Sequence, residues 1–408
     1  MNCRHCGAKL ERSFLDLGSA PPSNAYLRKE DLRGPETWYP LRVLVCGNCW
    51  LVQTEDFAGR EELFTDDYAY FSSFSTTWLA HARAYVAEMI DRFQLGADNR
   101  VVEIAANDGY LLQYVLDAGI PCYGVEPTAG TAAAAREKGI PVVERFFGVE
   151  LARELANEGR QADLAVANNV LAHVPDINDF VAGFTVLLKD SGVVTFEFPH
   201  LLRMVTENQF DTVYHEHYSY LSFSTVCRIF EKNGLRVFEV VELQTHGGSL
   251  RVFAQRMDTG LRKVSNAVNG LLKQERAAGM IEEGFYAGFQ EKTEKVKNDF
   301  LEFLLAARRR GKTVAAYGAA AKGNTLLNFA GVRPDLLKFV VDRNPAKQGR
   351  FLPGSRIPVV DESFLQVWRP NYLIILPWNL AEEISTQVDY VCSWGCKFVV
   401  VVPNLAIL

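Results

Sequence analysis

The sequence predicts an α/β protein in three parts: a small zinc-binding module at residues 1–66, a central Rossmann-like domain at 67–260, and a second Rossmann-like domain at 261–408 that begins with a helical linker at 261–310. Three observations give this prediction. Two CxxC pairs lie near the N-terminus, strand and helix patterns alternate through the central part, and the alternation starts again after Gly311. Such alternation favours parallel strands joined by right-handed crossovers.

Composition and charge are those of a globular protein. The 408 residues suffice for two or three cores, and 48% apolar with 23% charged residues gives no sign of disorder. The net charge of -6 argues against a broad nucleic-acid-binding surface. The N-terminus has no apolar leader, and no run reaches the roughly eighteen apolar residues of a membrane span. We therefore expect a cytoplasmic protein that binds neither membrane nor nucleic acid.

The N-terminal cysteines Cys3, Cys6, Cys46 and Cys49 form the two CxxC pairs. Each pair can bring two thiolates to one tetrahedral ion, so the duplicated spacing is typical of a structural zinc site. A disulfide is the alternative, and a cytosolic setting disfavours it. We expect a Zn²⁺ ion that stabilises the fold and takes no part in a reaction.

Two segments link this module to the central domain. Residues 68–75, YAYFSSFS, combine aromatic rings with hydroxyls and have no clean periodicity. They suit either the wall of a site or a packing segment between domains. In residues 77–95 apolar side chains recur at helical spacing, which predicts an amphipathic helix.

The first strand of the central domain, residues 101–105, is followed by a turn that lacks GxGxxG and therefore the dinucleotide fingerprint. It offers Glu103 in the strand and Asn107 and Gly109 in the turn, and Glu126 ends the next strand. An acidic side chain at that position can bind both hydroxyls of a ribose. With no phosphate cradle beside it, this pattern predicts a nucleoside without phosphates, a description that S-adenosylmethionine fits.

Polar residues also follow the later strands, at the edge where open α/β sheets bind ligands. Asn168 ends the fourth strand and His173 comes soon after it. These side chains suit either positioning of a ligand or capping of the next helix. A fifth strand is expected at 193–198, and residues 235–241 and 249–254 suit an antiparallel pair that completes the sheet of a class I methyltransferase.

The loop at residues 211–220, DTVYHEHYSY, holds two histidines, two carboxylates and three tyrosines. Imidazole, carboxylate and phenol are the side chains that move protons near neutral pH. Packing at a domain seam is the alternative for such a cluster. Its place after the fifth strand favours a proton-transfer loop.

The C-terminal unit repeats the pattern of strand, turn and helix at residues 314–328. Small residues at a helix start, together with Lys322, Arg343, Lys347 and Arg350, suit a phosphate cradle. An ordinary half domain with a solvated basic loop is the equal alternative.

Five strings carry a resemblance to a known family: EFPH at 197–200, FDTVYHEHYSYLS at 210–222, HGGSLRVF at 246–253, YGAAAKGNTLLN at 317–328 and DRNPAKQGRFLPG at 342–354. With the cysteine module they resemble the sugar C-methyltransferases that act on nucleotide-linked keto-deoxysugars, such as the enzyme that methylates C-3 in tetronitrose biosynthesis. The resemblance covers nearly the whole chain. It implies a zinc module, a methyltransferase domain that binds S-adenosylmethionine and a Rossmann-like domain, in this order.

The resemblance assigns the chemistry to Tyr214, Glu216 and His217, with Tyr68 facing the same site. A proton next to a ketone is very weakly acidic, so an enzyme must supply a base and stabilise the enolate oxygen. We expect His217 to be the base, Glu216 to orient or polarise it, and Tyr214 and Tyr68 to donate hydrogen bonds. Tyr214 and His217 can exchange roles.

The resemblance also implies two binding sets. The residues expected to bind the cofactor are Glu103, Asn107, Gly109, Glu126, Phe146, Phe147 and Asn168. Those expected to bind the nucleotide sugar, through its diphosphate, are Lys322, Asn324, Arg343, Lys347 and Arg350. One departure from the family pattern is Ala105-Ala106 in the first turn, where a Gly-Ser or Ala-Ser pair is more usual.

Three other readings stay open. An O- or N-methyltransferase acting on a small substrate needs the same cofactor and a general base but no ketone. A zinc-ribbon RNA-binding methylation factor is disfavoured by the net charge. An NAD-dependent oxidoreductase would bind its cofactor on the C-terminal unit, and that unit lacks both the GxGxxG turn and the ribose-binding acid expected of such a site. The sequence does not give the oligomeric state, and a monomer is compatible with it.

Overall fold

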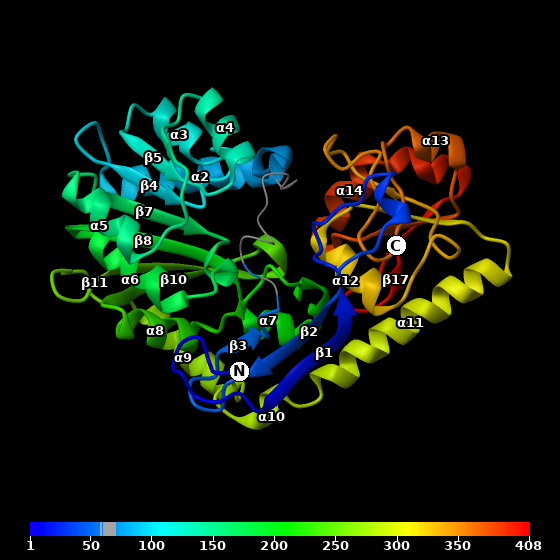
Figure 1. Cartoon of the computed structure of the whole chain (residues 1–408), viewed down its shortest axis with the longest axis horizontal. Coiled ribbons are helices and arrows are strands. Elements are labelled where there is room, and N and C mark those ends of the chain that lie inside the picture. Colours follow the sequence, from blue (N-terminus) through cyan, green and yellow to red (C-terminus); the bar gives the residue numbers. More distant parts are fainter. Residues whose placement is uncertain (58, 60–70) are drawn as a thin grey trace.

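The computed structural model describes residues 1–57, 59 and 71–408, whose strands form three sheets (Figure 1). The first sheet is antiparallel and has the order β1-β2-β3-β9. Its strands are β1 (Arg12–Ala20), β2 (Tyr39–Val45), β3 (Val52–Thr54) and β9 (Ser219–Tyr220). The last of these comes from the far side of the sequence, directly after the histidine-rich loop.

The second sheet has seven strands in the order β10-β11-β8-β7-β4-β5-β6. They are β4 (Val101–Ile104), β5 (Cys122–Val125), β6 (Val142–Val143), β7 (Ala162–Asn168), β8 (Leu188–Pro199), β10 (Leu235–Leu243) and β11 (Ser249–Arg256). Strands β4 to β8 pair in parallel, and β11 is antiparallel to both of its neighbours. The expected antiparallel pair at the end of the sheet is confirmed.

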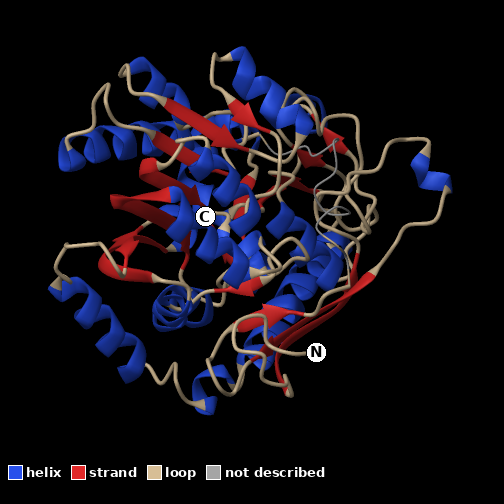
Figure 2. Ribbon diagram, turned by 60° about the vertical axis from the view of Figure 1, so that its left-hand side comes forward, coloured by secondary structure: helices blue, strands red, loops and turns tan. Residues whose placement is uncertain are grey.

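Helices flank this sheet on both faces (Figure 2). They are α2 (Thr76–Phe93), α3 (Leu112–Asp117), α4 (Ala129–Glu137), α5 (Val149–Asn157), α6 (Ile177–Leu187) and α8 (Phe223–Lys232). Helix α7 (Leu201–Thr206) packs instead in the core shared by the first and third sheets. The predicted amphipathic helix is confirmed as α2, which begins at the N-cap Ser75, whose hydroxyl accepts the backbone N–H of Trp78. Its buried residues Ala82, Tyr85, Val86 and Met89 face the sheet.

The segment expected to be one long helical tract is three helices, α9 (Asn266–Ala277), α10 (Glu283–Tyr286) and α11 (Phe289–Arg309). Gly279 and Gly288 stand between them with φ angles of 82° and 76°. This left-handed conformation cannot continue a right-handed helix, and glycine adopts it at low cost. The tract therefore bends around the first sheet before α11 reaches the C-terminal unit, as Figure 1 shows.

The third sheet has the order β14-β13-β12-β15-β16-β17, parallel except at the β17 edge. Its strands are β12 (Val314–Tyr317), β13 (Val340–Val341), β14 (Val359–Val360), β15 (Tyr372–Ile375), β16 (Lys397–Val400) and β17 (Ala406–Ile407). Its helices are α12 (Ala321–Phe329), α13 (Phe364–Trp368) and α14 (Ala381–Gln387). The expected Rossmann-like C-terminal unit is confirmed.

Short 3-10 helices occupy several connections. They are η1 (Asp31–Arg33), η2 (Ser72–Phe74), η3 (Leu171–His173), η4 (Phe210–Thr212), η5 (Thr245–Gly247), η6 (Trp378–Leu380) and η7 (Asp389–Trp394). Four of them, η3 to η6, lie next to residues of the site described below. Within the described part of the chain, no helix combines the length and the apolarity needed to cross a membrane.

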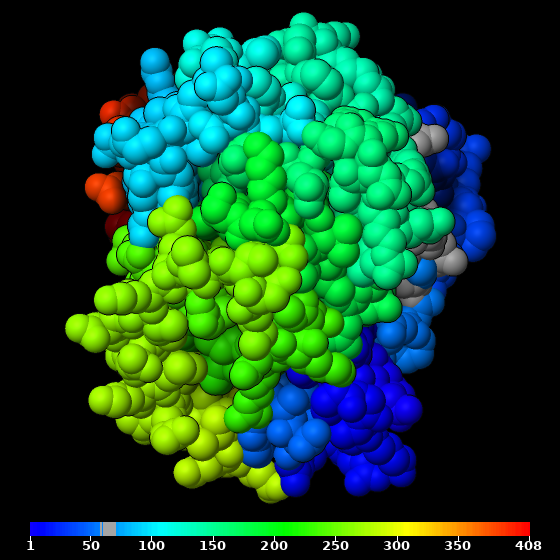
Figure 3. All heavy atoms as spheres, turned by 90° about the vertical axis from the view of Figure 1, so that its left-hand side faces the viewer, coloured from blue at the N-terminus to red at the C-terminus, as the bar shows by residue number. Residues whose placement is uncertain are grey.

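The first sheet joins the other two. Its β3 pairs with β9, and the Tyr26 hydroxyl donates to the Ala319 carbonyl oxygen of the C-terminal unit at 2.5 Å. Side chains of β1 and β2 share one core with α11, α12 and the third sheet. In Figure 3 the blue N-terminal atoms lie against the green surface of the central unit. The histidine-rich loop therefore lies where all three parts meet, while the domain boundaries at residues 66 and 260 stay predictions.

Candidate active site

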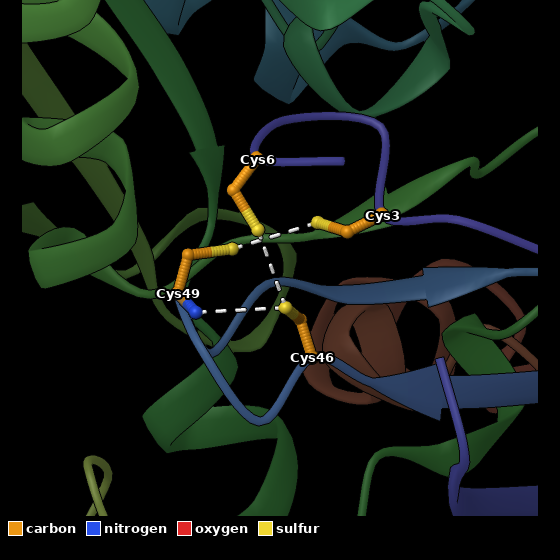
Figure 4. A group of neighbouring side chains, drawn as sticks. All are labelled: Cys3, Cys6, Cys46 and Cys49. Atoms are coloured by element: carbon orange, nitrogen blue, oxygen red, sulfur yellow. Dashed lines mark hydrogen bonds between the residues drawn. The ribbon is translucent and has the colours of Figure 1, made fainter. Parts of the chain in front are cut away.

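Cys3, Cys6, Cys46 and Cys49 converge in the N-terminal module (Figure 4). Their four sulfur atoms lie within 4.8 Å of one another, and the pairs Cys3–Cys49 and Cys6–Cys46 are each 3.5 Å apart. Zn–S bonds of about 2.3 Å in a tetrahedron place the sulfur atoms about 3.8 Å apart, so this cage fits zinc. Asn48 and Cys49 direct backbone N–H groups at the Cys46 sulfur, at 3.4 and 3.5 Å, as suits a thiolate.

A large cavity lies at the carboxyl ends of β4, β5 and β7. Its volume is about 1140 Å³, a figure that includes space open to the solvent. Of the residues expected to bind a cofactor, five line it: Asn107, Glu126, Phe146, Phe147 and Asn168. The parallel strands bring these side chains together because their carboxyl ends share one edge of the sheet.

Glu126 is fixed by the turn that follows β4. Its two carboxylate oxygens accept the backbone N–H groups of Asn107 at 2.9 Å and Thr128 at 3.0 Å. Burial raises the pKa of this carboxyl, and the two backbone donors act in the opposite direction. Each oxygen keeps a lone pair for a further donor. The carboxylate can therefore take a pair of ribose hydroxyls.

Two residues of the expected cofactor set do not line the cavity. Gly109 has a φ of 74°, and a Cβ there would lie 2.4 Å from the Ile140 Cδ1. The glycine is therefore required by the turn and by packing on α4. Glu103 is 1% exposed in the middle of β4, and burial raises the pKa of its carboxyl well above the usual range.

The cavity also uses residues that sequence reasoning did not assign to it, including Trp78, Tyr110, Arg145 and Asn169. One local signal was present for the last of these, because Asn169 directly follows Asn168 at the strand end where open α/β sheets bind ligands. In the structure Asn169 has a φ of 52°, the left-handed conformation that asparagine tolerates. The aromatic residues carry no comparable signal, because an aromatic residue at helical spacing is predicted to pack in the hydrophobic core.

The polar and aromatic side chains that line the cavity fit S-adenosylmethionine. Glu126 suits the ribose, and the rings of Phe146 and Phe147 offer an apolar wall for the adenine. At the other end, the buried Oδ1 of Asn168 has no hydrogen-bond partner among the described residues. A buried acceptor of this kind is costly unless a donor reaches it, and an ammonium group supplies one.

The histidine-rich loop holds a tyrosine–histidine pair. The Nδ1 of His217 lies 2.9 Å from the Thr212 carbonyl oxygen, and its Nε2 lies 2.8 Å from the Tyr214 hydroxyl. A carbonyl oxygen can only accept, so the imidazole proton is on Nδ1 and Nε2 accepts the phenol O–H. Burial lowers the pKa of His217 well below its usual value, and nearby His173 adds to the effect. His217 is therefore a neutral imidazole, and its Nε2 faces the phenol proton of Tyr214.

Glu216 does not have the contact expected of it. Its carboxylate is 1% exposed and accepts from the Asn24 amide at 3.1 Å, whereas the His217 ring is oriented by the Thr212 carbonyl. The structure thus gives the orienting role expected for Glu216 to a backbone group. The side chain of Glu216 instead ties the loop to the N-terminal module. Tyr68 lies outside the described residues.

The pair connects to the cavity through His173. This residue lines the cavity, and its ring meets that of His217 edge to face at 4.5 Å. Burial lowers the pKa of His173 to about 4, so it too is neutral. His217 itself is not among the residues that line the cavity.

One residue expected to bind substrate reaches this region. The Lys322 ammonium donates to the Asn379 amide oxygen at 2.7 Å and lies 4.7 Å above the Trp378 ring. Trp378 in turn donates its indole N–H to Asp211 at 2.8 Å. Burial raises the pKa of Asp211 to about 6, and the Lys322 charge acts in the opposite direction.

The other expected substrate residues do not converge on one point. The Asn324 amide donates to the Ser23 carbonyl oxygen at 2.6 Å, and the Lys347 ammonium donates to the Ala319 carbonyl oxygen at 2.8 Å. Both side chains therefore join segments of the protein. Arg343 is exposed and contacts Gln387, and Arg350 is partly exposed.

Three family models match the chain. The model described as "Putative zinc binding domain" matches residues 3–64, "Methyltransferase domain" matches 78–240, and "C-methyltransferase C-terminal domain" matches 244–403. The C-methyltransferase NovU of Streptomyces niveus is 35% identical over 402 residues, which are 98% of this chain and 95% of that protein.

This chain belongs to the C-methyltransferase family.

Two other matches are partial. A lovastatin nonaketide synthase polyketide synthase component from Aspergillus terreus is 31% identical over 155 residues, 36% of this C-methyltransferase and 5% of that protein. The solved structure of magnesium protoporphyrin IX methyltransferase from Synechocystis PCC 6803 with bound SAM covers 44% of this chain and 79% of that chain at 16% identity, with a TM-score of 0.34.

Membership fixes the coarse chemistry. The C-methyltransferase uses S-adenosylmethionine as methyl donor, in agreement with the side chains that line the cavity. It carries a zinc site in the four-cysteine cage. The expected enzyme class and cofactors are thereby confirmed. How the individual side chains serve the reaction is taken up below as a proposal.

Replacing Glu126 with glutamine should weaken binding of S-adenosylmethionine. The amide removes the charge and one of the two oxygens that hold the Asn107 and Thr128 N–H groups, and a hydrogen bond to a charged group contributes about 1.5–3 kcal/mol. We expect Kd to rise at least tenfold in isothermal titration calorimetry. The control is Glu144→Gln, which changes an exposed carboxylate paired with Arg136. If the two variants bound S-adenosylmethionine with equal affinity, Glu126 would not be part of the cofactor site.

Proposed function

We propose that this C-methyltransferase removes a proton from the carbon next to the ketone of a dTDP-linked 4-keto-deoxysugar and methylates that carbon, C-3 of the sugar. The observation that carries the proposal is the Tyr214–His217 pair, in which a neutral imidazole accepts from a phenol beside the cofactor cavity. An O- or N-methyltransferase has less need of a tyrosine–histidine pair that moves a proton, because its substrate atom already carries a lone pair.

The burial of the two groups supports Tyr214 as the one that touches the substrate. Tyr214 is partly exposed, whereas His217 is 9% exposed and has both ring nitrogens engaged. The phenol oxygen takes the proton from carbon while its own proton passes to Nε2 of His217. The electron pair of the broken C–H bond moves to the carbonyl oxygen. This is the exchanged assignment of the two roles that the sequence left open.

The surroundings of His217 suit the charge that it acquires. The Thr212 carbonyl oxygen holds the Nδ1–H in place and stabilises the imidazolium. Bound S-adenosylmethionine supplies the electrophilic sulfonium methyl group. The buried loop excludes water from the pair, which strengthens these interactions.

For the rest of the substrate we propose contacts from the C-terminal unit. Lys322 is a cation whose charge acts on His217, and it suits an oxygen of the sugar. Arg343 and Arg350 are the predicted residues with accessible charge for the diphosphate. Asn324 and Lys347 shape the site through the segments that they join.

Hydrogen exchange tests the proposal before any methyl transfer. In D₂O, with dTDP-4-keto-6-deoxyglucose and no methyl donor, the wild-type enzyme should exchange the C-3 hydrogen, and Tyr214→Phe should slow this exchange about 10²-fold or more. Proton NMR of the sugar ring follows the signal directly. Methyl transfer to a sugar oxygen, with no exchange at carbon, would replace the proposal with O-methylation.

A further inference from the structure

His246 is a partly exposed imidazole that the roles given above do not use. It lies in η5, at the start of the HGGS turn, and its Nε2 is 3.3 Å from the Asn169 amide nitrogen. Its ring packs on Trp78 with centroids 5.2 Å apart. Asn169 and Trp78 both line the cofactor cavity. His246 thus approaches that cavity from a different element than the loop that carries Tyr214 and His217.

The backbone that carries His246 is held in an unusual shape. Residues His246, Gly247 and Gly248 have φ angles of 55°, 85° and 109°. Two contacts keep the turn in place. The Gln209 amide donates to the Gly247 carbonyl oxygen at 2.7 Å, and a Cβ on Gly247 would lie 2.3 Å from the Trp378 ring. A left-handed histidine persists only where its surroundings hold it, and such residues gather at functional sites.

The protonation of His246 follows from its neighbours. An amide nitrogen can only donate, so Nε2 accepts from Asn169 and the ring proton is on Nδ1. Burial lowers the pKa of His246 to about 4, and the Lys322 charge adds to the effect. The ring is therefore a neutral hydrogen-bond donor. A neutral imidazole can polarise a carbonyl group in this form.

Exposure separates the groups of this region into two sets. His217, Asp211 and Glu216 are buried, while Tyr214, His246 and Lys322 are partly exposed. Lys322 lies 4.7 Å above the Trp378 ring, and the turn that carries His246 packs on the same ring through Gly247, so the two side chains are close enough to serve one small molecule. The accessible set combines a proton acceptor with a neutral donor and a cation.

We propose that His246 is a further catalytic residue, which donates its Nδ1–H to the ketone oxygen of the acceptor and, with Lys322 beside it, stabilises the negative charge that arises there as Tyr214 takes the proton. The inference rests on the proposed function and names the residues that stabilise the ketone oxygen during proton removal. No bond is formed to His246, and its proton stays on the ring. Removing one such donor from an oxyanion site lowers rates about 10²–10³-fold.

The decisive variant is His246→Gly. Glycine adopts a φ of 55° at low cost, so the turn keeps its shape and only the imidazole is lost. With dTDP-4-keto-6-deoxyglucose in D₂O and no methyl donor, we expect exchange at C-3 to fall about 10²-fold. Added imidazole should restore part of the rate in His246→Gly and leave the wild type unchanged. His246→Asn, which also tolerates a left-handed backbone, should keep more activity because its amide can donate.

A role limited to holding Trp78 and Asn169 in the cavity wall gives a different result. In that case His246→Gly weakens binding of S-adenosylmethionine but exchanges the C-3 hydrogen as fast as the wild type, and the inference is overturned while the proposed function stands. If the wild-type enzyme itself exchanges no hydrogen from this sugar but transfers a methyl group to it, both fail. Gly247→Ala serves as a second variant. Its Cβ meets the Trp378 ring and displaces the turn, so exchange should fall without rescue by imidazole.

Discussion

Replacing His217 with alanine should abolish measurable methyl transfer while leaving the affinity for S-adenosylmethionine nearly intact. The substitution removes the acceptor for the Tyr214 proton, and a positioned general base contributes about 10²–10⁴-fold to a rate. Binding should survive because His217 is not among the residues that line the cavity. Transfer from labelled S-adenosylmethionine to the sugar gives the rate, and calorimetry gives the Kd.

The matched control for this variant is His215→Ala, two residues earlier in the same loop. The His215 ring is also buried, but it faces Tyr39 and the Pro40 carbonyl oxygen in the N-terminal module. It should cost a similar amount of stability and little activity. If His217→Ala lost cofactor binding and activity in equal measure, the loop would be a structural element and the proposed proton transfer would fail.

Removal of the zinc ion should unfold the N-terminal sheet and inactivate the enzyme at the same time. Structural zinc contributes about 10–16 kcal/mol in zinc-finger peptides, comparable with the whole stability of a domain. Two of the four cysteines, Cys46 and Cys49, lie in the turn between β2 and β3. Strand β3 in turn pairs with β9, which directly follows the histidine-rich loop. Loss of the metal therefore reaches Tyr214 and His217 through one strand pairing.

Hydrogen–deuterium exchange by mass spectrometry can follow this effect. A chelator, or the variant Cys46→Ala, should raise exchange in both β3 and residues 211–220, with one zinc ion lost per chain by elemental analysis. Cys392→Ser is the control, since Cys392 is exposed and stands outside the cage. Unchanged exchange and full activity in a zinc-free enzyme would separate the metal from the site.

Much of the fold could be predicted because its signals are local. The CxxC spacing, the alternation of strands and helices, and the acid that ends β5 each depend on neighbouring residues, and all have the place expected of them. The linker was harder, because a helix-favouring composition hid the two glycines that break it. The antiparallel end of the second sheet followed from two apolar runs joined by a glycine turn.

The site was less accessible to sequence reasoning wherever a contact joins distant segments. Nothing near Glu216 indicates that its partner is Asn24, and nothing near Asp211 indicates Trp378. Lys347 illustrates the converse difficulty. A lysine in a glycine-containing basic loop suggests a phosphate ligand, and only the structure shows that its ammonium donates to the Ala319 carbonyl oxygen and lies 3.7 Å from Asp342. Charge is visible in a sequence, whereas the partner that uses it is set by packing.

The pairing of β9 with β3 also limits how the protein can be divided. Residues 78–240, cut out as a fragment, would keep the residues that line the cofactor cavity except Ser72, but would leave β9 without its neighbouring strand and Glu216 without Asn24. Such a fragment would also lack β11, the strand that lies between β8 and β10. Chimeras between relatives should therefore exchange the zinc module together with the histidine-rich loop, because the two share a strand pairing and a side-chain hydrogen bond.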